Sequence, residues 1–115
     1  MPSMTPINFG DVVLIGFPFT NLQATKKRPA VVISNFAYQQ SRPDIILMAI
    51  TSQVRSNLAT DEYILQDWQA AGLAKPSMTK PLIATLQQTQ IIRSLGTLTA
   101  PDESALRVLL AELLR

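Results

Sequence analysis

The chain lacks both cysteine and histidine. Without cysteine it can hold neither a disulfide framework nor a thiolate metal site. Without histidine it lacks the commonest general acid and base at neutral pH, and also the commonest metal ligand. Any catalysis by this chain must therefore be built from other groups.

Charged residues and long apolar runs are also scarce. Only 16% of the residues are charged, and no apolar run approaches the roughly 20 residues that a membrane-spanning helix needs. The first residues, MPSMTPINFGD, contain neither a basic region nor an apolar stretch, unlike a signal peptide. Because 47% of the 115 residues are hydrophobic, the chain can bury one sizeable core. We therefore expect a single domain, residues 1–115, in the cytoplasm.

The net charge of +2 is unevenly distributed. Residues 25–60 contain a single acid, Asp44, whereas residues 61–74 contain three acids and no base. A basic first half suits a polyanionic partner, although a solvated charged loop explains the charges equally well. The basic residues of this stretch are Lys26, Lys27, Arg28, Arg42 and Arg55.

Three apolar runs, at residues 11–19, 30–34 and 45–51, predict the first strands of a sheet. Each run is nearly continuous rather than alternating, which favours strands covered on both faces, as in a small closed barrel. The connections at 20–27 and 35–42 are too short for crossover helices, so the sheet should be mainly antiparallel.

Weaker patterns complete the predicted fold. Residues 52–60 predict a loop, residues 68–72 a helical turn closed by Gly72, and residues 62–65 and 92–98 short strands. Two further strands, at 77–80 and 82–86, should be interrupted by Pro81. The predicted class is thus mainly β with helices (α+β).

One helix is predicted, at residues 101–114, with Thr99 as its N-cap and Pro101 in its first turn. Five leucines recur with helical spacing and form one apolar stripe. The stripe could cover an open end of the barrel, which we favour, or pack against a second subunit. These leucines are Leu106, Leu109, Leu110, Leu113 and Leu114.

The residues that could carry chemistry are basic groups and hydroxyls. Arg28 directly precedes a strand, and its planar fork of donors suits a phosphate. Thr51 and Ser52 fall at a strand end, where hydroxyls can donate to phosphate oxygens or simply satisfy the backbone. Lys80 could point into a cleft or protect a sheet edge, and Phe19 could stack on a base or lie in the core. Residue types alone leave a phosphate-binding module and an inert domain equally open.

Order and spacing add a resemblance to the PemK/MazF-type toxins. Residues 10–34, GDVVLIGFPFTNLQATKKRPAVVIS, are similar to the family's opening strand, polar loop and R-P strand. IILMAITSQ at 45–53 resembles its third strand, and GLAKPSMTKPLIATL at 72–86 its G-L-x-K-P-S segment. LGTLTAPDESALRVLLAELL at 95–114 resembles its closing strand and helix. Four segments in the family's order make this resemblance specific.

The resemblance implies an SH3-like antiparallel β-barrel with a C-terminal helix, commonly a homodimer. It also implies a toxin of a type II toxin–antitoxin system, blocked by a cognate antitoxin protein and bound to operator DNA only as the toxin–antitoxin complex. Members are endoribonucleases (mRNA interferases) that cut single-stranded RNA at short sequences by attack of the ribose 2′-hydroxyl. They need neither a metal ion nor another cofactor.

The resemblance also assigns site residues. Arg28 matches the arginine that stabilises the transition state, Thr51 and Ser52 match the hydroxyl pair at the scissile phosphate, and Lys80 stands where many members carry the general acid. The first loop forms part of the RNA groove. The candidate RNA-binding residues are Phe19, Thr20, Asn21, Lys26, Lys27 and Arg55.

The sequence departs from the family pattern at the general base. Some members carry an acid at the position of Leu82, and some use a histidine in the first loop. Either Arg28 and a threonine suffice, or this copy is slow or inactive. The alternative function is therefore a non-catalytic SH3-like module that binds nucleic acid or antitoxin and represses its own operon together with the antitoxin.

Overall fold

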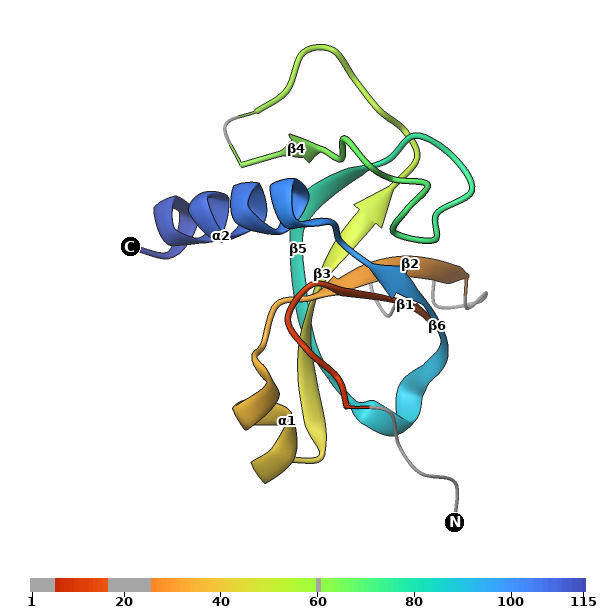
Figure 1. The fold of residues 1–115 in the computed structure, drawn as a ribbon, viewed down its shortest axis with the longest axis vertical. Coiled ribbons are helices and arrows are strands. Elements are labelled where there is room, and N and C mark those ends of the chain that lie inside the picture. Colours follow the sequence, from red (N-terminus) through yellow and green to blue (C-terminus); the bar gives the residue numbers. More distant parts are fainter. Residues whose placement is uncertain (1–5, 17–25, 60) are drawn as a thin grey trace.

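A computed structural model of the chain describes residues 6–16, 26–59 and 61–115. Its strands form one antiparallel sheet in the order β4-β5-β3-β2-β1-β6, which confirms the predicted α+β class (Figure 1). None of the helices in the described part of the chain is long and apolar enough to cross a membrane. The elements are β1 (Asp11–Gly16), β2 (Lys27–Val32), α1 (Phe36–Ser41), β3 (Asp44–Thr51), β4 (Tyr63–Ile64), β5 (Met78–Gln87), a 3₁₀ turn (Gln88–Gln90), β6 (Ile91–Thr97) and α2 (Ala100–Leu114).

The sheet curls strongly. Only the 3₁₀ turn Gln88–Gln90 separates β5 from β6, yet three strands lie between them in the sheet. In a flat sheet the two strands would stand about 19 Å apart, at ~4.8 Å per strand, which is more than this turn can span. Among the described residues β4 and β6 do not pair, so the predicted closed barrel is wrong in that respect and the sheet remains open.

The apolar strands are buried on both faces of the sheet, as their continuous runs predicted. Along β3, Met48 and Ile50 lie in one core cluster while Leu47 and Ala49 lie in a second. Because successive side chains of a strand point to opposite faces, each apolar run contributes side chains to both clusters. The first cluster includes Val12, Val31, Met48, Ile50, Leu65, Leu98, Leu106 and Leu110, and the second includes Val13, Ile15, Ala30, Val32, Ile45, Leu47 and Ala49.

A short helix, α1, occupies the segment that the sequence predicted as a plain connection at 35–42. Its N-cap is Asn35, whose Oδ1 accepts a hydrogen bond from the backbone N–H of Tyr38 at 2.8 Å. Buried Gln39 donates from Nε2 to the carbonyl of Ser34 at 2.9 Å and anchors the helix to the end of β2. The sequence did not predict α1, because six residues are too few to show a helical apolar periodicity. The contact of Gln39 with Ser34 that anchors the helix also leaves no sequence pattern.

Strand β5 runs through Pro81, although the sequence predicted two strands interrupted there. Thr79 pairs with Ile50 and Ile83 pairs with Met48, so residues 80–82 together face the single residue Ala49. This bulge leaves Pro81 out of the regular ladder, where its missing N–H costs no hydrogen bond. Strand β2 likewise begins at Lys27, before the predicted start at residue 30.

Helix α2 begins within a residue of the prediction and has Thr99 at its N-cap position as predicted, but the side chain that anchors it is Asp102. The Thr99 hydroxyl donates to Asp67 at 2.6 Å and caps no helix N–H. The fully buried Asp102 carboxylate accepts from the Tyr63 hydroxyl at 2.7 Å and from the backbone N–H groups of Gln66 and Asp67 at 2.9 Å. Burial, reinforced by the hydrogen bond to Asp102, raises the pKa of Tyr63 well above its ordinary value, so the phenol keeps its proton and remains a donor.

The predicted leucine stripe of α2 is buried only along its first half. Leu106 and Leu110 lie in the first core cluster, as expected if the stripe packs against the sheet and not against a second subunit. Leu113 and Leu114 are exposed by 36% and 69%, where the helix projects beyond the sheet (Figure 1). The end of α2 is therefore an uncovered apolar surface.

The predicted turn at 68–72 packs closely on β6. Gly72 has φ +86°, the left-handed region that favours glycine, and a Cβ there would lie 1.9 Å from the carbonyl oxygen of Leu95. A Cβ on Gly96 would meet the carbonyl oxygen of Ala71 at 2.5 Å. The two glycines thus allow the backbones of the turn and of β6 to touch.

Candidate functional site

The candidate site lies at the end of the sheet where β2 begins and β3 ends. The ladder between β2 and β3 ends at the pair Ala30–Ala49; Arg28 lies two residues before Ala30 and Thr51 two residues after Ala49, so strand alternation puts both on the face of these alanines. Directly opposed residues of antiparallel strands share a face of the sheet, and Arg28 also pairs with Ile15 on β1. Arg28 and Thr51 therefore stand on one face, on adjacent strands.

A small pocket joins Thr51 to Lys80. It has a volume of about 160 Å³ and lies beside the pair Thr51–Met78, which links β3 to β5. Lys80 enters from the first residue of the β5 bulge, and Arg55 enters from the loop after β3. Three of the predicted site residues thus share one pocket, whose lining is Thr51, Gln53, Val54, Arg55, Met78 and Lys80.

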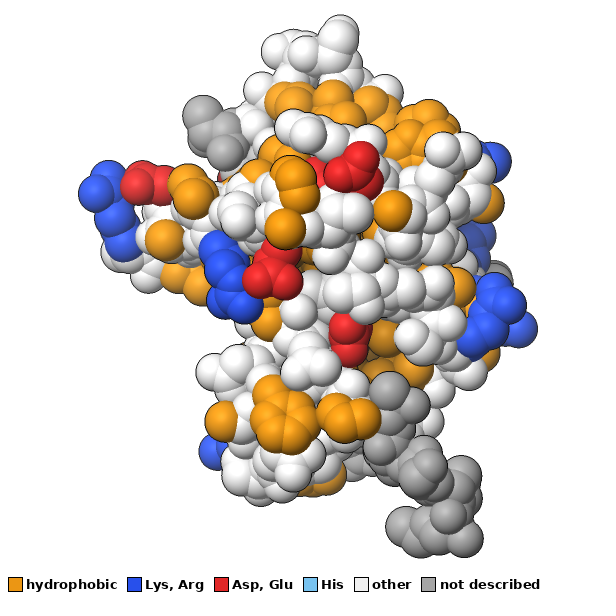
Figure 2. Space-filling view, viewed as in Figure 1, with side chains coloured by type: hydrophobic (Ala, Val, Ile, Leu, Met, Phe, Trp, Pro, Cys, Tyr) orange, Lys and Arg blue, Asp and Glu red, His pale blue; other side chains and the backbone are white. Residues whose placement is uncertain are grey.

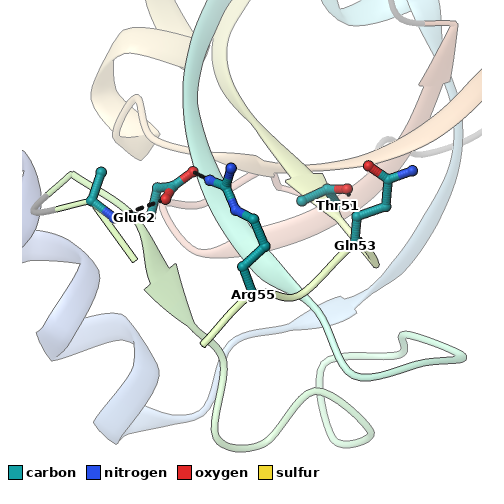
Figure 3. A network of polar contacts seen from close by, with 5 residues as sticks. Thr51, Gln53, Arg55 and Glu62 are labelled. Atoms are coloured by element: carbon teal, nitrogen blue, oxygen red, sulfur yellow. Dashed lines mark hydrogen bonds and ion pairs between the residues drawn. The ribbon is translucent and has the colours of Figure 1, made fainter. Parts of the chain in front are cut away.

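The Thr51 hydroxyl is oriented by the start of the loop. Its Oγ1 accepts the backbone N–H of Gln53 at 3.2 Å (Figure 3). A hydroxyl that accepts one hydrogen bond keeps its own proton for donation. Thr51 can therefore donate to an oxygen of a ligand in the pocket, and Lys80 and Arg55 supply positive charge beside it.

The other predicted residues lie around this pocket or outside the described part of the chain. Arg28 is half-buried in β2, and Ser52 is exposed; neither is among the residues that line the pocket. Lys26 and Lys27 are exposed at the start of β2. Phe19, together with the predicted groove residues Thr20 and Asn21 and the end of the predicted strand 11–19, falls outside the described residues.

Sequence reasoning missed Glu62, which forms an ion pair with Arg55. Figure 3 shows the Arg55 side chain directed at the Glu62 carboxylate, where Nη2 meets Oε2. Glu62 Oε1 accepts the backbone N–H of Ala59 at 3.0 Å. The acidic stretch after residue 60 was visible in the sequence, but no pattern indicated which base it would meet.

Leu82, where some relatives of the predicted family carry an acid, is exposed by 43% in the same bulge as Lys80. The residues that line the pocket include two bases and no carboxylate. Among the described residues no three acidic side chains gather as a metal site requires. What this arrangement can do is bind an anion and donate protons to it.

A larger hollow lies elsewhere. With a volume of about 480 Å³, it runs between α2 and the α1 end of the sheet and is lined mainly by apolar groups, with Arg107 stacked 3.8 Å over the Phe9 ring. Figure 2 shows this side of the molecule, on which basic and acidic side chains lie next to one another in several places, so the described residues drawn there form no continuous basic patch.

Comparison with known proteins identifies relatives. Residues 8–114 match the family model described as "PemK-like, MazF-like toxin of type II toxin-antitoxin system". A search of curated proteins returned no match. Among solved structures, a mycobacterial endoribonuclease in complex with its cognate antitoxin superposes with a TM-score of 0.73 at 18% identity, over 96% of this chain and 95% of that one.

Other solved structures share the fold. A chain of the MazE–MazF structure from Deinococcus radiodurans gives a TM-score of 0.74 at 20% identity, covering 96% of this chain and 97% of that one. The Mycobacterium tuberculosis toxin MazF-mt6 gives 0.70 at 19% identity, covering 89% and 93%. At such identities the structural likeness establishes the fold, while the family model extends over nearly the whole chain.

Proposed function

The chain belongs to the PemK-like, MazF-like toxin family of type II toxin–antitoxin systems, and from that premise we propose that it is an endoribonuclease. It cuts single-stranded RNA at short sequences by attack of a ribose 2′-hydroxyl on the adjacent phosphate, without a metal ion. The observation that carries the proposal is the pocket in which Thr51, Arg55 and Lys80 meet. The solved relatives described as endoribonucleases support it.

The reaction needs charge stabilisation above all. As the 2′-oxygen attacks, negative charge grows on the phosphate oxygens, and fixed donors lower the barrier most when they lie beside them. In this proposal the Thr51 hydroxyl of the pocket and the Arg28 guanidinium of the neighbouring strand β2 supply such donors. The bond from phosphorus to the leaving 5′-oxygen then breaks, and Lys80 donates a proton to that oxygen.

No carboxylate of the pocket lining is available to remove the proton of the attacking hydroxyl. In this proposal that proton passes to hydroxide from the solvent. The rate of cleavage should then rise about tenfold for each pH unit through the neutral range, as expected when hydroxide is the base. A plateau or a bell-shaped profile near neutrality would instead reveal a general base in the protein.

The test is a cleavage assay with the purified protein in EDTA. Single-stranded RNA should yield products with 2′,3′-cyclic phosphate and 5′-hydroxyl ends. Arg28→Ala should lose the activity, whereas Arg115→Ala, which removes an exposed arginine at the end of α2, should keep it. Intact RNA across several buffers would refute the enzyme and favour the second candidate, a binding module that represses its operon with the antitoxin; the missing carboxylate is the observation in its favour.

The family also suggests the partners. We expect a cognate antitoxin that blocks the protein in the cytoplasm, and operator DNA bound only by the toxin–antitoxin complex. We also expect a homodimer, since Leu113 and Leu114 leave an apolar end on α2. Light scattering of the purified protein measures the dimer directly.

A further inference from the structure

The ion pair between Arg55 and Glu62 stands at the rim of the proposed RNA-cleaving pocket. Arg55 belongs to the exposed loop after β3 and lines the pocket with Thr51 and Lys80. Glu62 precedes β4, which is hydrogen-bonded to β5, the strand that carries Lys80. The pair therefore connects an exposed loop to the framework that holds the pocket.

Glu62 is the fixed member of the pair. Its side chain is only 6% exposed, and its Oε1 accepts the N–H of Ala59 while its own N–H donates to the Ala59 carbonyl at 3.1 Å. Arg55 is the solvated member, with a side chain 59% exposed. A long exposed side chain samples many conformations when nothing holds it. The ion pair with the fixed Glu62 carboxylate is therefore what gives Arg55 a defined position.

The guanidinium is only partly used by this contact. It has five N–H donors, and the described residues accept a hydrogen bond from Nη2 alone. The four remaining donors, on Nε, Nη1 and Nη2, include the paired N–H groups that can bind two oxygens of a phosphodiester. Arg55 can thus hold Glu62 with one edge and an RNA phosphate with another.

We propose that Glu62 is a positioning residue that holds Arg55 ready to bind a phosphate next to the scissile one. This inference rests on the proposed function, since it assigns the RNA strand to the same pocket. Glu62 touches no RNA; it acts through Arg55 by reducing the freedom that Arg55 loses on binding. The pair should consequently affect binding of the strand and leave the chemical step alone.

The experiment measures binding and cleavage separately. The binding probe is a fluorescein-labelled, mixed-sequence single-stranded RNA of 14 nucleotides with 2′-O-methyl riboses, which cannot be cleaved. Arg55→Ala should raise its Kd about tenfold and reduce the slope of log K against log salt by about 0.7, the value for one lost phosphate contact on a single strand. Glu62→Gln should raise Kd about fivefold, and both variants should raise KM with kcat unchanged.

The deciding measurement is the double variant. If Glu62 acts through Arg55, adding Glu62→Gln to Arg55→Ala changes Kd by less than twofold. The matched control is the pair Glu112 and Arg115 on α2, where Glu112→Gln and Arg115→Ala should leave Kd and KM unchanged. Thermal melting of each variant shows whether a change in binding follows a change in folding.

The outcomes separate this inference from the proposed function. A wild-type protein that binds the 2′-O-methyl RNA but cuts no RNA refutes the nuclease, and the coupling of Glu62 to Arg55 can still be read from Kd. Wild-type-like or tighter binding by Glu62→Gln overturns the inference, as do additive effects in the double variant or a failure of the wild type to bind the probe. If Glu62→Gln binds like the wild type or the double variant is additive, cleavage of RNA by the wild type would still support the nuclease.

Discussion

Two polar clusters of this protein differ in how completely their hydrogen bonds are satisfied. At the junction of α2 with β4, the buried Asp102 carboxylate accepts three protein donors, from Tyr63, Gln66 and Asp67. At the end of β3, Thr51 and the two bases that line its pocket keep donors free for a ligand.

This difference separates a structural role from a binding role. A buried carboxylate is tolerated only when protein donors replace its water, and Asp102 meets that condition. Exposed cations without enough carboxylates keep their attraction for an anion from solution. The first cluster should therefore affect stability and the second activity, and each of the following variants tests that division.

The largest expected effect is the loss of stability in Asp102→Ala. Three donors would lose their acceptor, two of them backbone N–H groups at the α2 junction, and we expect the free energy of unfolding to fall by about 3 kcal/mol. Urea denaturation measures it, with Glu112→Ala, an exposed acid of the same helix, as the control. A loss under about 1 kcal/mol would mean that Asp102 does not anchor the helix. Cleavage per folded molecule should remain that of the wild type.

The reverse pattern is expected for Lys80→Met. If Lys80 protonates the leaving oxygen, cleavage should fall about 100-fold, equivalent to about 2.7 kcal/mol in the barrier. Stability should change by no more than about 0.5 kcal/mol, because Lys80 is not part of either core cluster. Single-turnover kinetics and urea denaturation measure the two quantities. A large fall in stability with little change in cleavage would move Lys80 to the structural cluster.

Tyr63→Phe should cost about 1.5 kcal/mol, because Asp102 keeps its two backbone donors and loses one hydroxyl. The variant also has a signature in pH. Burial raises the pKa of Tyr63 in the folded state above the value of about 10 expected in the unfolded chain. The contribution of Tyr63 is therefore complete below pH 10 and is lost as the pH rises further. Unfolding of the wild type between pH 9 and 11 should show that loss, and Tyr63→Phe should show less of it.

The sequence predicted most of what depends on local pattern. Local patterns located the strands at 45–51 and 92–98 within a residue, and Thr99 with Pro101 located the start of α2 within a residue. The resemblance pointed to Thr51 and Lys80, which share the pocket. Strands and helices that bury one or both faces need apolar residues at regular spacing, and that spacing can be read from the sequence alone.

Features that depend on contacts between distant segments were missed. Pro81 was predicted to end a strand, but a bulge opposite Ala49 accommodates it. Thr99 is the N-cap residue of α2 as predicted, but its hydroxyl bonds to Asp67, more than 30 residues away, and not to an N–H of the helix. The bond of Glu62 to Arg55 spans only seven residues, but it requires the loop after β3 to fold back on itself, which no local pattern indicates. The roles of Arg28 and Ser52 remain predictions.

The smallest expected effect distinguishes the two neighbouring hydroxyls. Thr51 lines the pocket and is oriented by the Gln53 N–H, whereas Ser52 is exposed beside it and is not among the lining residues. Thr51→Val keeps the shape of the side chain and should lower kcat about tenfold by removing one donor to the developing charge. Ser52→Ala should lower it by only about twofold. Equal losses in single-turnover assays would mean that the loop moves Ser52 into the pocket when RNA binds, and would place both hydroxyls on the phosphate.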